Sequence, residues 1–228
     1  MTMTMTVTTA QPSTFILQID IVSDVMCPWC VIGYKQLARA LEAVGTPHNI
    51  RWHPFELNPN MPPAGQNITE HVVEKYGATP EQSRASRVQM TQAGTDVNFE
   101  FAYTEDMRMH NTFNTHQLLH WAAQQGRMHD LKMALFTAHF THGRNLSDNA
   151  VLADIAASIG LDQDQAGTVL ADQRFAGEVR AAQQFWVQQG IQSVPAVVFN
   201  QRHLVSGAQG VDSFTQILHQ LNDMPEAA

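Results

Sequence analysis

Two kinds of hydrophobic pattern occupy different parts of the chain. Apolar, β-branched residues run together over 15–22 and again over 50–55, which predicts two strands. Between them, apolar residues recur every three or four positions from 31 to 41, which predicts a helix that ends at Gly45. The first 58 residues therefore predict a β-α-β unit.

A long helical pattern follows a proline-rich connector that begins near residue 58. Start and stop signals predict helices over 69–76, 79–94, 111–125, 131–140, 147–159 and 175–189. Residues 97–101 alternate between apolar and polar side chains and predict a short extended piece beneath these helices. Strand patterns return at 196–199 and 203–205, and a last helix is predicted over 211–221. We expect one discontinuous α/β domain (14–58 and 190–226) with a helical insertion (59–189).

Composition narrows the class of protein. The 228 residues are 44% hydrophobic and 15% charged, so the chain can bury a sizeable core. A net charge of -8 and the lack of a basic run argue against nucleic acid or an anionic membrane as a partner. The N-terminus has no signal-peptide pattern, and no stretch is long and apolar enough to span a bilayer. We expect a soluble cytoplasmic protein with residues 1–13 disordered, and the sequence does not indicate its oligomeric state.

The chain has two cysteines, Cys27 and Cys30, separated by Pro28 and Trp29 at the junction of the first strand and helix. Structural disulfides are rare in a reducing cytoplasm, and one with this spacing would close a very short loop. A zinc site requires about four ligands, but no second cysteine pair is present. The pattern therefore favours a redox pair over a structural disulfide or a metal site.

Several segments together match one known family: 23–30 with 32–33, 52–59, 111–112 with 116, 193–196 and 206–209. They resemble the DsbA family of thioredoxin-fold oxidoreductases, in its FrnE-like, polyketide-associated dithiol-disulfide isomerase branch. The resemblance implies an α/β thioredoxin fold with a large all-helical insertion. It also implies a cis peptide bond between Val194 and Pro195, facing the cysteines, and no bound cofactor other than the redox-active pair.

Disulfide exchange needs a thiolate, and the N-terminus of a helix favours negative charge. We therefore assign Cys27, at the start of the helix, as the nucleophile and Cys30, one turn further in, as the resolving thiol. Pro28 suits the first helical turn, where its missing N–H would be unpaired. Trp29 either offers an apolar contact to substrate or covers the helix end.

Other candidate residues lie around this pair. Related enzymes place an acid six residues before the first cysteine, where this chain has Ile21. Asp24 would oppose formation of the Cys27 thiolate, and we expect it to be an N-cap instead. The resemblance implies that Asn111 and His116 line the substrate cleft with Pro28, Trp29, Val194 and Pro195, although His116 also fits a core or surface histidine with a structural role.

The leading hypothesis is a thiol-disulfide oxidoreductase, with isomerase activity, that acts on protein or small-molecule dithiols. Glutathione is a candidate exchange partner, and residues 60–185, which contain no cysteine, are expected to select substrate without taking part in the exchange. One alternative is a glutathione-dependent isomerase or kappa-type glutathione transferase, which uses a serine-like residue in place of the cysteine pair. The other is a non-catalytic chaperone or binding module.

Overall fold

A mixed sheet forms the centre of the computed structural model, which describes residues 16–223. Within those residues its strand order is β2-β1-β5-β6. Strands β1 (Leu17–Ser23) and β2 (His48–Pro54) are parallel to each other. Strand β5 (Ala196–Phe199) is antiparallel to both of its neighbours, β1 and β6 (His203–Ser206). Ile21 pairs with both Trp52 and Val197, so distant parts of the chain meet in one sheet. The predicted disorder of residues 1–13 lies outside the described residues.

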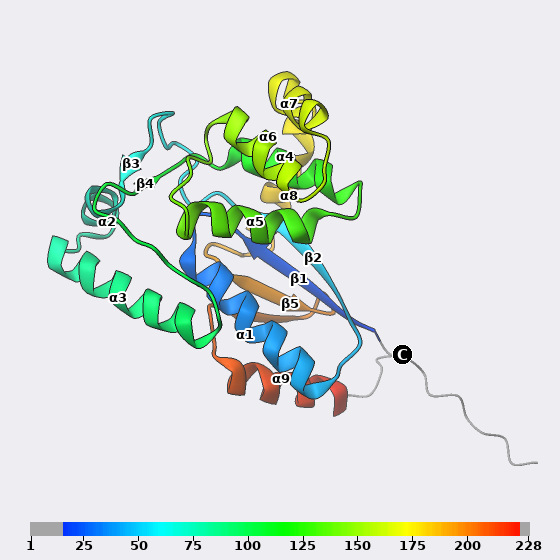
Figure 1. Cartoon of the computed structure of the whole chain (residues 1–228). Helices are drawn as coiled ribbons and strands as arrows, with labels where there is room; N and C mark the ends of the chain where they lie inside the picture. The colour runs from blue at the N-terminus through cyan, green and yellow to red at the C-terminus, as the bar shows by residue number, and fades with distance from the viewer. Residues whose placement is uncertain (1–15, 224–228) are drawn as a thin grey trace, which may run out of the picture.

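Helices α1 (Pro28–Val44) and α9 (Val211–Asp223) cover one face of this sheet, and both lie below it in Figure 1. Pro28 occupies the first turn of α1, and Gly45 ends the helix in the left-handed region with φ of 69°. Leu37 and Leu41 of α1 and Phe214 of α9 are buried together with the apolar strand residues. The predicted strand and helix pattern of this unit is confirmed.

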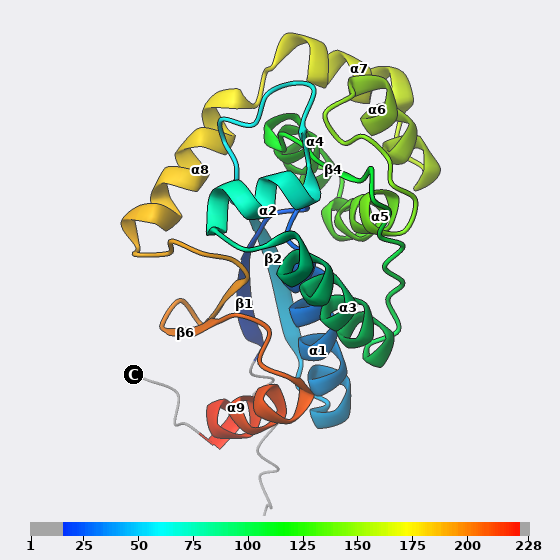
Figure 2. The same cartoon turned by 90° about the vertical axis from the view of Figure 1, so that its left-hand side faces the viewer.

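The chain between β2 and β5 is mostly helical, and its later helices lie above the sheet in Figure 1, whereas its first helices lie to the left of the sheet. They are α2 (Ile68–Tyr76), α3 (Pro80–Asp96), α4 (Phe113–Ala123), α5 (Met128–Phe140), α6 (Asn149–Ser158), α7 (Gln163–Asp172) and α8 (Ala176–Gln188). Figure 2 shows α2 and α3 facing the viewer, between α8 and α5. Strands β3 (Gln66–Asn67) and β4 (Arg108–Met109) form a small antiparallel pair beside α2. In residues 16–223, no helix combines the length and apolarity needed to cross a membrane.

The short segment after α3 differs from its prediction. Residues 97–101 belong to neither sheet, and α3 continues through Gly94 to Asp96. Phe99 and Phe101 are both buried, and their rings pack edge to face with centroids 4.8 Å apart. The alternating pattern therefore reflects two aromatic side chains entering the core of the insertion rather than strand pairing.

Candidate active site

The cysteine pair lies where β1 leads into α1. Cys27 is the N-cap residue of α1, and the N–H of Cys30 donates to the Cys27 carbonyl at 3.0 Å. Both thiols are free, with Cys27 5% exposed and Cys30 completely buried. Burial, followed by a hydrogen bond from the thiol to Cys27, raises the pKa of Cys30 well above its ordinary value. The first cysteine is thus the accessible one and the second is enclosed.

The loop before β5 contacts the cysteine pair. The Val194–Pro195 peptide bond is cis, as the resemblance implies, and the Val194 carbonyl oxygen lies 3.6 Å from the Cys27 sulfur. Gly33 makes this approach feasible, because a Cβ atom there would lie 3.4 Å from the Pro195 ring and 3.3 Å from the Cα atom of Ala208. The cysteines and the proline loop, about 165 residues apart in sequence, therefore form one site.

Cys27 opens into a groove of about 590 Å³ between the sheet domain and helices α2 and α3. Of the candidate substrate-binding residues, Pro28, Trp29 and Val194 line this groove, and Pro195 follows Val194 in the chain. Trp29 is 41% exposed, so its ring is available to a molecule in the groove. The remaining walls are largely apolar and aromatic, with lining residues that include Met26, Phe55, Leu57, Ile68, Val72, Tyr76, Met90, Tyr103, Met109 and Phe140.

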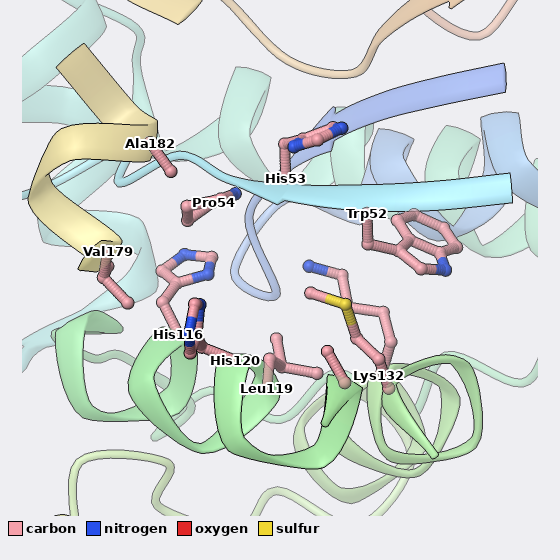
Figure 3. A pocket seen from close by; sticks show the side chains of 11 residues that line it. Trp52, His53, Pro54, His116, Leu119, His120, Lys132, Val179 and Ala182 are labelled. Atoms are coloured by element: carbon pink, nitrogen blue, oxygen red, sulfur yellow. The ribbon is translucent and has the colours of Figure 1, made fainter. Parts of the chain in front are cut away.

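Asn111 and His116 lie outside this groove. Asn111 accepts a hydrogen bond from the N–H of Phe113 at 2.9 Å, so it shapes the turn into α4. His116, on α4, is 2% exposed and its Nε2 atom lies 2.9 Å from the Phe55 carbonyl oxygen. Burial lowers the pKa of His116 to about 3, which keeps the ring neutral. Because α4 faces β2 and α8, His116 lines a second cavity instead (Figure 3).

Asp24 is not the N-cap that the sequence predicted, because the N-cap of α1 is Cys27, three residues later. Its carboxylate is 1% exposed and accepts hydrogen bonds from the N–H groups of Met26 at 3.2 Å and Leu57 at 2.7 Å. Burial raises the pKa of Asp24 in spite of these hydrogen bonds. Asp24 therefore ties the end of β1 to the segment after β2, directly beneath the cysteines.

Lys132, on α5, is a site residue that the sequence reading missed. It is 1% exposed, its Nζ atom lies 3.5 Å from the carbonyl oxygen of Ser23, and it sits 5.5 Å from the Trp52 ring centroid. Burial lowers the pKa of Lys132 to about 8, against the opposing influence of Cys30 and Asp24. In the sequence, the signal for its burial is helical spacing, because buried residues of α5 follow three, four and seven positions after Lys132.

The described residues contain no group of three or more His, Cys, Asp or Glu side chains arranged to hold a metal ion. The reactive features of the site are the thiol pair and the backbone of the proline loop at the groove, with Asp24 and Lys132 buried behind them. Such an arrangement can perform thiol-disulfide exchange, since it has an accessible thiol at a helix N-terminus and a second thiol one turn away.

Comparisons with known proteins agree with this geometry. A family model described as the DSBA-like thioredoxin domain matches residues 18–219. YwbO of Bacillus subtilis, an uncharacterized protein, is 23% identical over 203 residues, or 89% of this chain and 96% of its own. A crystal structure named a "probable DsbA oxidoreductase" from Streptomyces coelicolor is 31% identical with a TM-score of 0.87, covering 93% of each chain.

A more distant structure shares the fold. The cytosolic disulfide reductase DsbM from Pseudomonas aeruginosa, solved with GSH, is 16% identical with a TM-score of 0.63, over 91% of this chain and all of its own. These matches confirm the predicted α/β thioredoxin fold with a helical insertion. Because the family model spans nearly all of the described residues, the chain belongs to the DSBA-like thioredoxin domain family.

Proposed function

We propose that this protein is a thiol-disulfide oxidoreductase in which Cys27 attacks and Cys30 resolves. The observation that carries the proposal is the difference in access between the two thiols, with Cys27 at the floor of an open groove and Cys30 fully buried one turn behind it. A substrate disulfide reaching the groove meets Cys27 first. The mixed disulfide that forms is then within reach of Cys30, which releases the reduced substrate and leaves Cys27 and Cys30 joined.

Two features of α1 suit Cys27 to the first step. The first turn of α1 has no side-chain cap, so the Cys27 sulfur stands where the unpaired N–H groups and the helix dipole favour negative charge. Pro28 contributes no N–H there, which leaves the N–H of Trp29 nearest the cap position. The Val194 carbonyl beside the sulfur offers an acceptor to the backbone of an extended substrate.

The groove indicates the substrate class. A volume of about 590 Å³ suits a small-molecule disulfide or one or two side chains of a peptide. Because the walls are mostly apolar, we propose that preferred substrates carry an apolar group next to the reacting sulfur. Glutathione is the proposed exchange partner in a cytoplasmic setting, and isomerase activity and membership of the FrnE-like branch belong to the same proposal.

The alternatives make different demands on the cysteines. A glutathione-dependent isomerase or kappa-type transferase activates glutathione with a serine-like residue and has no use for a second, buried thiol. A chaperone or binding module would keep its activity after both cysteines were replaced. Retention of Cys27 and Cys30 at one helix start therefore favours exchange over both alternatives.

Equilibration with glutathione buffers tests the proposed function. Tryptophan fluorescence should report the redox state as the ratio of reduced to oxidised glutathione varies, because Trp29, one of four tryptophans, lies between the cysteines. The expected result is a single two-electron transition that disappears in Cys27→Ser, with mass spectrometry showing a loss of two hydrogens in the oxidised protein. Oxidation that stops at a stable glutathione adduct on wild-type Cys27 would contradict the proposal.

A further inference from the structure

A second cavity, of about 260 Å³, lies behind the active site, and its lining shares no residue with that of the groove. It is bounded by β2, α4, α5 and α8, through Trp52, His53, Pro54, His116, Leu119, His120, Ala123, Met128, Lys132, Val179 and Ala182. The solvent exposure of the lining residues varies: Ala123 is exposed, His120 and Ala182 are half-buried, and Lys132 is buried. The cavity therefore leads from the surface of the insertion toward the underside of the cysteine site.

Lys132 is the cation at the inner end of this cavity. Figure 3 shows its nitrogen pointing from the helices toward β2, between Trp52 and His116. An ammonium group has three donors. Within residues 16–223, the Lys132 ammonium donates one long hydrogen bond, of 3.5 Å, to the Ser23 carbonyl oxygen. Ser23 ends β1, four residues before Cys27. The amine is thus placed between the cavity and the cysteine-bearing loop, with donors left for water.

A buried lysine in this position is costly for folding. Taking an ammonium group out of water is unfavourable unless it is paired, and no carboxylate of the described residues lies within salt-bridge distance of Lys132. The rings of Trp52 and Phe136, at 5.5 and 5.2 Å, compensate only in part. Perturbed groups of this kind are typical of functional sites.

Resting on the proposed function, we infer that Lys132 of the helical insertion receives the proton of Cys30, and that the rear cavity carries this proton to solvent while substrate fills the groove. Cys30 is completely buried and must lose its proton before it can attack. A substrate bound to Cys27 covers the groove, so water cannot take the proton from that side. The cavity behind Lys132 shares no lining residue with the groove, so a substrate in the groove does not cover it.

The Cys30 thiol gives its proton to the neutral Lys132 amine, directly or through a water molecule, and the Cys30 thiolate attacks the Cys27 sulfur of the mixed disulfide. The bond between Cys27 and the substrate breaks, the substrate leaves as a thiolate with the electron pair, and the Cys27–Cys30 disulfide forms. The Lys132 ammonium then releases its proton to water in the cavity, and the reverse reaction uses the same groups in the opposite order.

Two histidines that face Lys132, His116 and His53, do not compete with it when a thiol titrates. Burial holds the pKa of His116 near 3 and lowers that of His53, so both rings are neutral when a thiol titrates. Lys132, with a pKa of about 8, is therefore able to accept and to release a proton near neutral pH. Among residues 16–223, the titratable groups around Lys132 are Asp24 and Cys27 from the β1–α1 junction, Cys30 from α1, His53 from β2, and His116 and His120 from α4.

A titration without substrate tests the link between Lys132 and Cys30. The protein is labelled with ¹³C at cysteine Cβ in the Cys27→Ser background, and the Cys30 signal is followed against pH by NMR. Lys132→Met should move the Cys30 midpoint upward by at least about one pH unit, a tenfold loss of thiolate at a given pH. Lys35→Met, on α1 and partly exposed, is the matched control and should leave the midpoint in place. An unchanged midpoint in Lys132→Met and in the parallel variant Lys132→Gln would overturn the inference.

Single-turnover kinetics with an aromatic disulfide then test the step itself. Lys132→Met should slow release of the substrate thiol about tenfold at pH 7 and shift the rise of that rate to higher pH. Ala182→Leu, which fills the cavity and keeps the lysine, should slow the same step at saturating substrate without moving the Cys30 midpoint. Full release rates in Ala182→Leu would refute the cavity as the proton route. If wild-type protein shows no exchange while the midpoint still moves, the proposed function fails and the Lys132–Cys30 coupling stands.

Discussion

Replacing Gly94 with alanine tests how the insertion supports the groove. A Cβ atom at Gly94 would lie 2.5 Å from the Cδ2 atom of Phe101 and 2.7 Å from the Phe99 carbonyl oxygen. Alanine gains about 1 kcal/mol in helix propensity, but forcing a methyl group into a filled core costs about 1–3 kcal/mol. Because the 2.5 Å separation requires the Phe101 ring to move, we expect the cost to outweigh the gain, with a net loss of up to about 2 kcal/mol.

The displaced ring should also alter the groove. Phe101 stacks on Tyr103 at 5.4 Å and packs against Phe140 at 5.1 Å, and both of these line the groove. Urea unfolding monitored by circular dichroism measures the change in free energy of unfolding. Gly167→Ala on α7 is the control, because no atom lies within 4 Å of its Cβ position, and it should gain about 1 kcal/mol. Equal gains in the two variants would refute the packing argument.

Other predictions concern pH, an ion pair and substrate choice. Burial lowers the pKa of His139 to about 3 from 6.5, so stability is lost as the pH falls below 6.5, where only the unfolded chain takes up the proton. Relative to wild type, His139→Leu should therefore gain about 1.4 kcal/mol per pH unit between pH 6 and 4 in urea unfolding, and a constant difference would contradict this. Arg180→Leu should cost about 1–3 kcal/mol, because Arg180 pairs with the Glu56 carboxylate, whose side chain is 3% exposed. Adding Glu56→Gln should restore most of that stability, and no recovery would show that the ion pair is not the cause. Trp29→Ala should raise KM for an aromatic disulfide about three- to tenfold and leave KM for 2-hydroxyethyl disulfide within about twofold, whereas equal changes would argue against an apolar contact.

Local signals explain why much of the fold is predictable from the sequence. Strand β1, the cysteine pair and α1 follow one another within 30 residues, and Pro28 and Gly45 mark the start and end of the helix. Helix α7 was missed because it buries only Ala166, Val169 and Leu170, which is a weak apolar pattern. Its clearest signal is Asp162, whose side chain caps the helix by accepting from the N–H of Gln165.

The site is less predictable where it depends on packing between distant elements. Asp24 looks like an N-cap in the sequence, yet its carboxylate binds the N–H of Leu57, 33 residues away. Lys132 reaches Ser23 across 109 residues, and the rear cavity exists only because α4, α5 and α8 meet over β2. The insertion is expected to take no part in the exchange because it has no cysteine. Under the proposal above, its buried Lys132 takes part by accepting a proton.

Trapping of mixed disulfides tests the central claim most directly, that Cys27 attacks and Cys30 resolves. Wild type, Cys27→Ser and Cys30→Ser are each reduced, exposed to an aromatic disulfide and to oxidised glutathione, quenched with acid, and analysed by non-reducing electrophoresis and intact mass spectrometry. Cys30→Ser should accumulate a covalent adduct on Cys27, because the mixed disulfide forms but no second thiol is present to resolve it. Cys27→Ser should remain unmodified, since Cys30 is completely buried. An adduct on Cys30 in Cys27→Ser, or an adduct in neither variant, would contradict the account.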